Sequence, residues 1–273
     1  MVDIVRVREL ILEAGKAILE VYRTPDFQVT SKEDRSPLTL ADSRSHEILS
    51  RGLRSLYPRI PLLSEEGKEI PYSVRRQWPL FWLVDPLDGT KEFIKRNDEF
   101  TVNVALVEDR KPVLGFIYLP VFEVLYLGDI RQGCWEIRGD QRRSLKVSPL
   151  QGKEPVRVVK SRSHPSPQVE ELLGLLPSHR AMDRGSALKF CALASGEADF
   201  YPRLGPTWEW DTGAGHAIVQ AAGGVMVDPF GNPLLYNKPK LLNGPFLAAG
   251  SLEWLQNTGL LEKASNLMKK KLS

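Results

Sequence analysis

The feature that most constrains this chain is a short apolar run that ends in two aspartates. Residues 81–84 are apolar throughout, as in a buried strand, and Asp85-Pro86-Leu87-Asp88-Gly89-Thr90 follows without a break. A carboxylate at the end of a buried strand costs free energy unless another group compensates its charge. Any fold of this chain must therefore supply a compensating group at that strand end.

The same arrangement occurs at two other places. Leu62-Leu63-Ser64 leads into Glu65-Glu66, and Trp208-Glu209-Trp210 leads into Asp211, just ahead of a predicted helix over 212–222. Clustered carboxylate oxygens are the ligands that Mg²⁺ prefers, and Mg²⁺ takes substrate phosphate oxygens into its remaining positions. Together the three acidic segments predict a magnesium centre for phosphoryl transfer. Each acid taken alone also fits a turn, a solvated loop or a helix N-cap.

The hexapeptide has a geometry suited to this chemistry. Asp85 and Asp88 are three residues apart, so both carboxylates and the Leu87 carbonyl between them can face one point. Gly89 lets the backbone approach a ligand closely. A short helix predicted over 91–96 would then begin where helix starts bind phosphate. Phosphatases that form an aspartyl-phosphate have two aspartates only two residues apart, so the spacing here disfavours that mechanism.

The remaining pattern predicts two lobes. Helical periodicity over 2–22 and 40–56 is followed by short apolar runs typical of an antiparallel meander, at 101–107, 113–119 and 124–127. After a polar segment at 148–155 the chain alternates strands and helices. We therefore expect an N-terminal α+β lobe over residues 1–150 and a C-terminal α/β lobe over residues 151–273, with helix and sheet layers stacked.

Composition narrows the choice of partners. The formal net charge of +3 favours anionic ligands but is too diffuse for nucleic acid. Charged residues interrupt the N-terminal segment, and no apolar run is long enough to span a membrane, so we expect a cytoplasmic protein. The run Lys269-Lys270-Lys271 is read as a solvated tail, with weak peripheral association with a membrane as the alternative. Cys134 and Cys191 lack metal-ligand spacing and are expected to be buried thiols.

Three motifs together resemble those of the inositol monophosphatase superfamily, whose members are magnesium-dependent, lithium-sensitive phosphatases of sugar phosphates and nucleotides. They are Ser64-Glu65-Glu66, Asp85 to Thr90, and Trp210-Asp211 with the small residues that follow. Their order and spacing agree over nearly the whole chain. Longer stretches are similar to the CysQ-type branch, the 3'(2'),5'-bisphosphate nucleotidases: 83–97, 161–164, 185–191 and 201–207. The resemblance implies a layered αβαβα sandwich.

The resemblance also implies roles for the matching residues. The ligands of two or three Mg²⁺ ions would be Glu65, Asp85, the Leu87 carbonyl, Asp88 and Asp211. The attacking water would be positioned and deprotonated by Thr90 with Asp42 or Glu65; the Asp42 position fits a capping box equally well. The substrate contacts would be Gly89 and Thr90 for the scissile phosphate, and Ser163, His164, Gly185, Lys189 and Asp211 for the rest of the nucleotide.

The implied reaction is hydrolysis of adenosine 3',5'-bisphosphate to AMP and phosphate by direct attack of a metal-activated water, linked to sulfate assimilation. Lys91, Lys95 and Arg96 follow the phosphate loop, where each either neutralises a second phosphate or belongs to an exposed helix face. One rival function is an inositol or sugar monophosphatase. Another is a catalytically silent metal- or nucleotide-binding protein, which the complete set of acids disfavours. The sequence leaves monomer and homodimer open.

Overall fold

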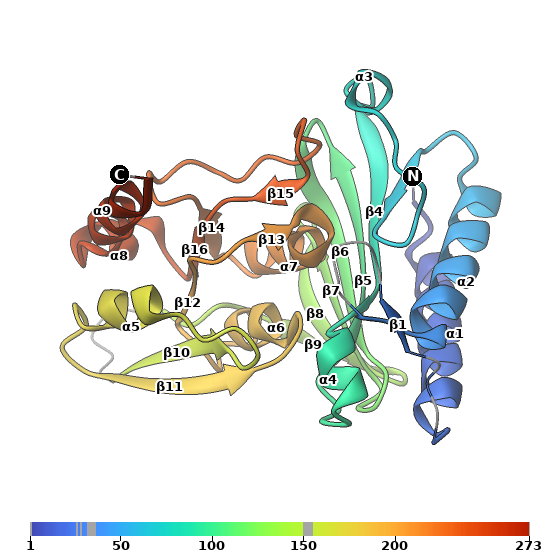
Figure 1. The fold of residues 1–273 in the computed structure, drawn as a ribbon, viewed down its shortest axis with the longest axis horizontal. Helices are drawn as coiled ribbons and strands as arrows, with labels where there is room; N and C mark the ends of the chain where they lie inside the picture. Colours follow the sequence, from blue (N-terminus) through green and yellow to red (C-terminus); the bar gives the residue numbers. More distant parts are fainter. Residues whose placement is uncertain (1, 26, 28, 32–36, 150–154, 273) are drawn as a thin grey trace.

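The computed structural model describes residues 2–25, 27, 29–31, 37–149 and 155–272, and these residues build alternating layers of helix and sheet (Figure 1). The outer helices on one side are α1 (Ile4–Tyr22) and α2 (Leu40–Leu56), which cover a 7-stranded sheet. The central helices are α6 (Leu188–Ala194) and α7 (Glu209–Ala221). A 5-stranded sheet follows, and its far face is covered by α5 (Pro167–Leu173), α8 (Leu252–Asn257) and α9 (Leu260–Leu272). The layered αβαβα sandwich is thereby confirmed.

The 7-stranded sheet contains the predicted meander and extends it. Its strands, in spatial order, are β3 (Leu62–Ser64), β4 (Leu80–Asp88), β5 (Thr101–Glu108), β6 (Lys111–Leu119), β7 (Val124–Asp129), β8 (Gly133–Arg138) and β9 (Gln141–Leu145). Strand β3 pairs with β4 in parallel, and every later neighbour is antiparallel. Strands β8 and β9 were not predicted; of the two, β9 is an edge strand and is largely polar. Residues 141–144 of β9 are exposed, so no apolar alternation marks them.

The two N-terminal helices pack on this sheet as their periodicity predicts. Along α1, Val7, Ile11, Ala14 and Ile18 are fully buried. Asp3 caps the helix, because its Oδ1 accepts hydrogen bonds from the amides of residues 5 and 6 at 3.0 and 3.2 Å. Helices α1 and α2 therefore cover the face of the 7-stranded sheet that lies opposite the central helices.

Helix α7 lies unusually close to the other face of the sheet. A Cβ atom at Gly115 of β6 would lie 2.4 Å from the carbonyl oxygen of Ala214, and one at Gly128 of β7 would lie 2.5 Å from the Cα atom of Ile218. Only glycine allows helix and sheet backbones to approach so closely. The middle of α7 is thereby held against β6 and β7, which belong to the same sheet as β4 with Asp85 and Asp88.

The 5-stranded sheet has the spatial order β11 (His179–Arg184), β10 (Val156–Ser161), β12 (Phe200–Arg203), β16 (Phe246–Ala249) and β14 (Val225–Val227). The sequence analysis missed β11, an edge strand with mostly exposed side chains, and also β16, α8 and α9. The expected lobe boundary at 150/151 lies outside the described residues. A single apolar cluster contains side chains from β4 and β6 together with α6, α7 and β16, so the core is continuous across the two halves of the chain.

Smaller elements complete the chain: β1 (Thr30–Ser31), β2 (Pro37–Leu38), α3 (Tyr72–Arg75), α4 (Thr90–Ile94), β13 (Thr207–Trp208) and β15 (Leu242–Asn243). Cys134 and Cys191 are buried and free, as predicted. In the part of the chain that the structure describes, no helix has the length and apolar character needed to cross a bilayer.

Candidate active site

The two aspartates of the hexapeptide lie within strand β4 rather than in a turn after it. Asp85 pairs with Asn103 and Asp88 pairs with Thr101, with a register shift between the two pairs. A β-bulge therefore lies between the two aspartates. A bulge re-aims side chains without ending the strand, so both aspartates stay anchored to the sheet.

The predicted acids meet in one pocket of about 240 Å³. Its lining includes Glu65 after β3, Asp85, Leu87 and Asp88 from the bulge, Gly89 and Thr90 at the start of α4, and Asp211 from α7. These residues come from three separate segments of the sequence. The structure thus brings together all the predicted metal ligands, together with the two residues predicted to hold the scissile phosphate.

Asp85 is buried among other acids. Its side chain is buried, and its Oδ1 accepts a hydrogen bond from the Leu87 amide at 3.1 Å. Burial raises the pKa of Asp85 well above its usual range, and the charges of Glu65, Asp88 and Asp211 raise it further. A positive charge at this position would therefore be strongly stabilised.

Asp88 is held by hydroxyl and amide donors from distant segments. Its Oδ2 accepts from Ser186 Oγ at 2.6 Å and from Asn103 Nδ2 at 3.4 Å, and Thr101 Oγ1 lies 2.7 Å from Ser186 Oγ. Burial still raises the pKa of Asp88, although Ser186 and the charge of Lys189 lower it in part. The sequence analysis gave Ser186 no role, because it is 98 residues from Asp88 and stood out only as part of the 185–191 segment.

Asp211 lies inside helix α7, not just before it as expected. The helix begins at Glu209, and Asp211 Oδ2 accepts a hydrogen bond from the Trp208 amide at 2.8 Å. Burial raises the pKa of Asp211 well above its usual range, with further contributions from Asp88 and Glu65. The side chain therefore both caps the helix and extends the set of buried acids.

Asp42 makes the capping contact at the start of α2 and also a hydrogen bond with Thr90. Its Oδ2 accepts from the Thr39 amide at 2.7 Å and from Thr39 Oγ1 at 2.5 Å, which is the capping interaction at the start of α2. Its Oδ1 accepts from Thr90 Oγ1 at 3.2 Å. Asp42 is thus oriented by its own helix and bonded to the threonine at the pocket.

Of the residues predicted to contact the nucleotide, His164 and Lys189 line the pocket, and Ser163 and Gly185 are not part of its lining. The Ser163 hydroxyl donates to Glu92, and the Gly185 amide donates to Glu99 Oε2 at 2.6 Å. The further residues that line the pocket include Ser161, Tyr201 and Arg203, to which the sequence had assigned no role. They lie at the ends of β10 and β12, a position that no local pattern marks as functional.

Basic side chains also line the pocket: Lys91, His164, Lys189 and Arg203. Burial lowers the pKa of Lys189 to about 8, although the carboxylate of Asp88 opposes the shift. Burial and the charge of Arg203 lower the pKa of His164. The buried Nε of Arg203 has no hydrogen-bond partner among the described residues. The acids and the basic groups thus line one pocket, an arrangement suited to an anion bound through a cation.

The basic residues after the phosphate loop do not act together. Lys91 lines the pocket. Arg96 instead donates to the carbonyls of Tyr22 and Thr24 at 2.7 and 2.5 Å and lies over the ring of Phe27. Arg96 therefore ties the end of α1 to α4 and is unavailable to a second phosphate.

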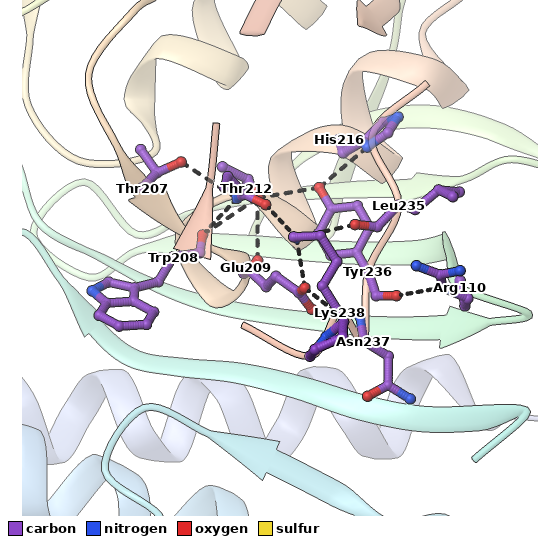
Figure 2. A network of polar contacts seen from close by, with 12 residues as sticks. Arg110, Thr207, Trp208, Glu209, Thr212, His216, Leu235, Tyr236, Asn237 and Lys238 are labelled. Atoms are coloured by element: carbon purple, nitrogen blue, oxygen red, sulfur yellow. Dashed lines mark hydrogen bonds and ion pairs between the residues drawn. The ribbon is translucent and has the colours of Figure 1, made fainter. Parts of the chain in front are cut away.

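Figure 2 shows a polar network around the start of α7. The fully buried Glu209 accepts from the Asn237 amide at 2.6 Å, and from the amide and Nζ of Lys238 at 3.0 and 2.6 Å. Tyr236 in the same segment donates to Thr212 Oγ1 at 3.2 Å, and its hydroxyl lies 3.2 Å from His216 Nδ1. This network fixes the first turn of α7, and with it the position of Asp211.

The donor set of the pocket fits Mg²⁺. Asp85, Asp88 and Asp211 are carboxylates whose burial favours protonation unless a cation is present, and Leu87 lines the pocket beside them. Within the described residues, no three acidic, histidine or cysteine side chains already converge on one point as ligands.

Comparisons with known proteins agree with this geometry. The model of the inositol monophosphatase family matches residues 2–269. The curated 3'(2'),5'-bisphosphate nucleotidase CysQ of Escherichia coli strain K12 is 46% identical over 244 residues, which cover 88% of this chain and 97% of that protein. The CysQ of Buchnera aphidicola is 40% identical over 248 residues, covering 89% and 92%.

Solved structures give the same result. The crystal structure of CysQ from Bacteroides thetaiotaomicron, described as a bacterial member of the inositol monophosphatase family, superimposes with a TM-score of 0.80 at 40% identity, covering 90% of this chain and 97% of that one. An inositol monophosphatase from Anabaena superimposes with a TM-score of 0.73 at 24% identity, covering 97% and 94%, and shares the fold.

Proposed function

This chain belongs to the inositol monophosphatase family, and from that premise we propose that it is a Mg²⁺-dependent 3'(2'),5'-bisphosphate nucleotidase that hydrolyses adenosine 3',5'-bisphosphate to AMP and phosphate. One observation carries the proposal. The acids at the ends of β3 and β4 and in α7 share a pocket with the Gly89-Thr90 loop, in a chain 46% identical to a curated nucleotidase. The reaction would serve sulfate assimilation in the cytoplasm.

The proposed metal ligands are the pocket carboxylates and one carbonyl: Glu65, Asp85, Leu87 O, Asp88 and Asp211. Two or three Mg²⁺ ions held there would neutralise charge on the phosphate oxygens and lower the pKa of the attacking water. The acids themselves supply the oxygen ligands and hold them on the sheet and on α7. The backbone amides of Gly89 and Thr90 are proposed to hold the scissile phosphate.

Proton removal from the attacking water is assigned to the Thr90–Asp42 pair. The Thr90 hydroxyl already donates to Asp42 Oδ1, so it can accept a hydrogen bond from water and orient it. Asp42, or Glu65 in its place, takes the proton, because a threonine hydroxyl alone is too weak a base. The Thr39 contacts keep Asp42 in the orientation that this step needs.

The leaving nucleotide is assigned to the basic side chains of the pocket. His164, Lys189 and Arg203 would contact the nucleotide and its second phosphate, with Ser161 beside them. Ser163 and Gly185 would act from behind this surface, through the glutamates that they contact. Asp211, which lines the same pocket, would also contact the sugar.

The test is phosphate release with Mg²⁺ from adenosine 3',5'-bisphosphate and from inositol 1-phosphate, in wild type and in Asp88→Asn. We expect a strong preference for the nucleotide and loss of release in Asp88→Asn. A preference for inositol 1-phosphate would replace the substrate assignment with a sugar monophosphatase. Folded protein that releases phosphate from neither would favour a silent binder.

A further inference from the structure

Glu99 joins two loops from the second half of the chain to the segment that carries the phosphate loop. Its Oε2 and Oε1 accept from Arg162 Nε and Nη2 at 2.7 and 2.9 Å. Its Oε2 also accepts from the Gly185 amide at 2.6 Å. The same Arg162 donates to the Asp183 carbonyl at 2.9 Å. A single carboxylate thus binds residues 161–164 and residues 183–186 at once.

The contact is close and partly shielded from solvent. The Glu99 side chain is 12% exposed, against 44% for Arg162. Burial raises the pKa of Glu99, but the hydrogen bonds from Arg162 and Gly185 outweigh it and lower the pKa overall. A Cβ atom at Gly185 would lie 2.7 Å from Glu92 Cγ and 3.0 Å from Glu99 Cβ, so this backbone approaches the glutamates more closely than other residues allow.

A second glutamate on the same segment supports the arrangement. Glu92 in α4 is 4% exposed and accepts a hydrogen bond from the Ser163 hydroxyl. The segment from Gly89 to Glu99 therefore carries the phosphate loop at one end and binds both C-terminal loops along the rest of its length. Those loops hold or flank His164 and Lys189, which line the pocket.

We propose that Glu99 is a positioning residue that holds the nucleotide-binding loops, 161–164 and 183–186, at a fixed place relative to the phosphate loop. Glu99 is not part of the pocket lining, and it acts through Arg162 and Gly185. The inference rests on the proposed function for its substrate, but the contact itself exists without any ligand. With Glu99 in place, leaving group and scissile phosphate bind to one rigid surface.

The first test is the kinetics of Glu99→Gln, which keeps the size of the side chain and removes its charge. A charge-assisted hydrogen bond is worth about ten- to a hundredfold in an equilibrium constant, so we expect KM for adenosine 3',5'-bisphosphate to rise by about tenfold or more. We expect kcat to change by less than about twofold and the inhibition constant of inorganic phosphate to stay unchanged, because phosphate alone needs only the phosphate loop. Arg162→Met should give a smaller rise in KM, since the Gly185 contact remains.

The second test needs no substrate or metal. Hydrogen exchange of the Gly185 amide and of the peptides that contain the two loops should become faster in Glu99→Gln, with no change in the strands of the 7-stranded sheet. Glu108→Gln is the matched control, because it weakens a glutamate–arginine contact with Arg131 at the partly exposed end of β5. It should change neither KM nor the exchange of these loops.

The positioning role of Glu99 would be overturned if Glu99→Gln weakened inhibition by phosphate as much as it weakened nucleotide turnover. It would also be overturned if hydrogen exchange of the Gly185 amide stayed unchanged in that variant. If wild type hydrolyses no nucleotide, the proposed function fails, and the exchange experiment still decides the role of Glu99.

Discussion

Glu209 and Asp211 lie two residues apart in the first turn of α7, yet the protein surrounds them differently. Glu209 faces the network of Figure 2, where two backbone amides and the Lys238 ammonium donate to it. Asp211 faces the pocket, where the Trp208 amide donates to it and where two other carboxylates repel it. A buried acid with a built-in cation is a structural element, whereas buried acids grouped without one are suited to an exchangeable cation.

Outside the pocket, a second buried acid is also paired with a basic side chain. Asp199, buried between β10 and β12, is paired with Arg157 at 2.6 Å. Among the described residues, no ion pair is found for Asp85, Asp88 or Asp211. The fold can therefore neutralise buried acids with its own basic side chains, and it forms no such ion pair with the three pocket aspartates that the structure describes.

The largest expected effect comes from removing a pocket acid. Asp85→Asn should lower kcat by about 10³-fold, because ligand loss forfeits several kcal/mol of charge stabilisation in the transition state. Without Mg²⁺ at pH 7, the same change should leave the free energy of unfolding equal or higher, since it removes a repelled buried charge. Kinetics with Mg²⁺ and urea unfolding in EDTA measure the two effects. A large loss of metal-free stability would contradict the contrast drawn here.

Glu209, which is paired with Lys238, is expected to stabilise the fold rather than to destabilise it. Glu209→Gln should lower the free energy of unfolding by about 3 kcal/mol, because it leaves the Lys238 ammonium without its buried partner. Urea unfolding checks this, with the exposed Glu253→Gln as control. A change under about 0.5 kcal/mol in Glu209→Gln would mean that the network contributes little to α7.

Binding of Mg²⁺ should stabilise the protein through the pocket acids and not through Glu209. At about 100 times its dissociation constant, Mg²⁺ should add about 2.7 kcal/mol to the free energy of unfolding, which for a chain of this size is a rise of about 5 °C or more in Tm. Thermal unfolding with and without Mg²⁺ measures it. Glu209→Gln should keep the rise in Tm and Asp85→Asn should lose it; the reverse result would place the cation elsewhere.

The smallest effect concerns pH. The folded-state pKa of Asp199 is lowered: burial raises it, but the hydrogen bonds from Arg157 prevail. Its contribution is therefore present above the unfolded pKa and lost as pH falls through the folded pKa. Asp199→Asn should cost about 1 kcal/mol at pH 7, allowing for the partly exposed arginine, and progressively less below about pH 4.

The pocket acids should respond to pH with the opposite sign. Their folded-state pKa values are raised, so their contribution to metal-free stability is present below the unfolded pKa and lost as pH rises through the folded pKa. Urea unfolding in EDTA from pH 4 to 7.5 should therefore show Asp85→Asn gaining stability relative to wild type as pH rises. Parallel curves for Asp85→Asn and Asp199→Asn would contradict the distinction between the two groups of acids.

The residues that are costly to bury, or that must be buried, could be recognised from the amino-acid sequence alone. Acids placed directly after apolar strands are visible in the chain, and so are helical faces such as Val7, Ile11 and Ile18. From these, a magnesium pocket and a layered fold could be predicted, because burial and periodicity are local properties of a segment. The edge strands β9 and β11 were missed for the same reason, since their exposed side chains carry no local pattern.

The neighbours of each acid could be identified only from the tertiary structure. The Ser186 hydroxyl on Asp88, the Arg162 and Gly185 donors on Glu99, and the bulge between Asp85 and Asp88 all join segments far apart in the chain. Such contacts depend on how helices and sheets approach one another, here through the glycines beneath α7. No local pattern encodes that approach, so the sequence could locate the charges but could not say which of them the protein would neutralise itself.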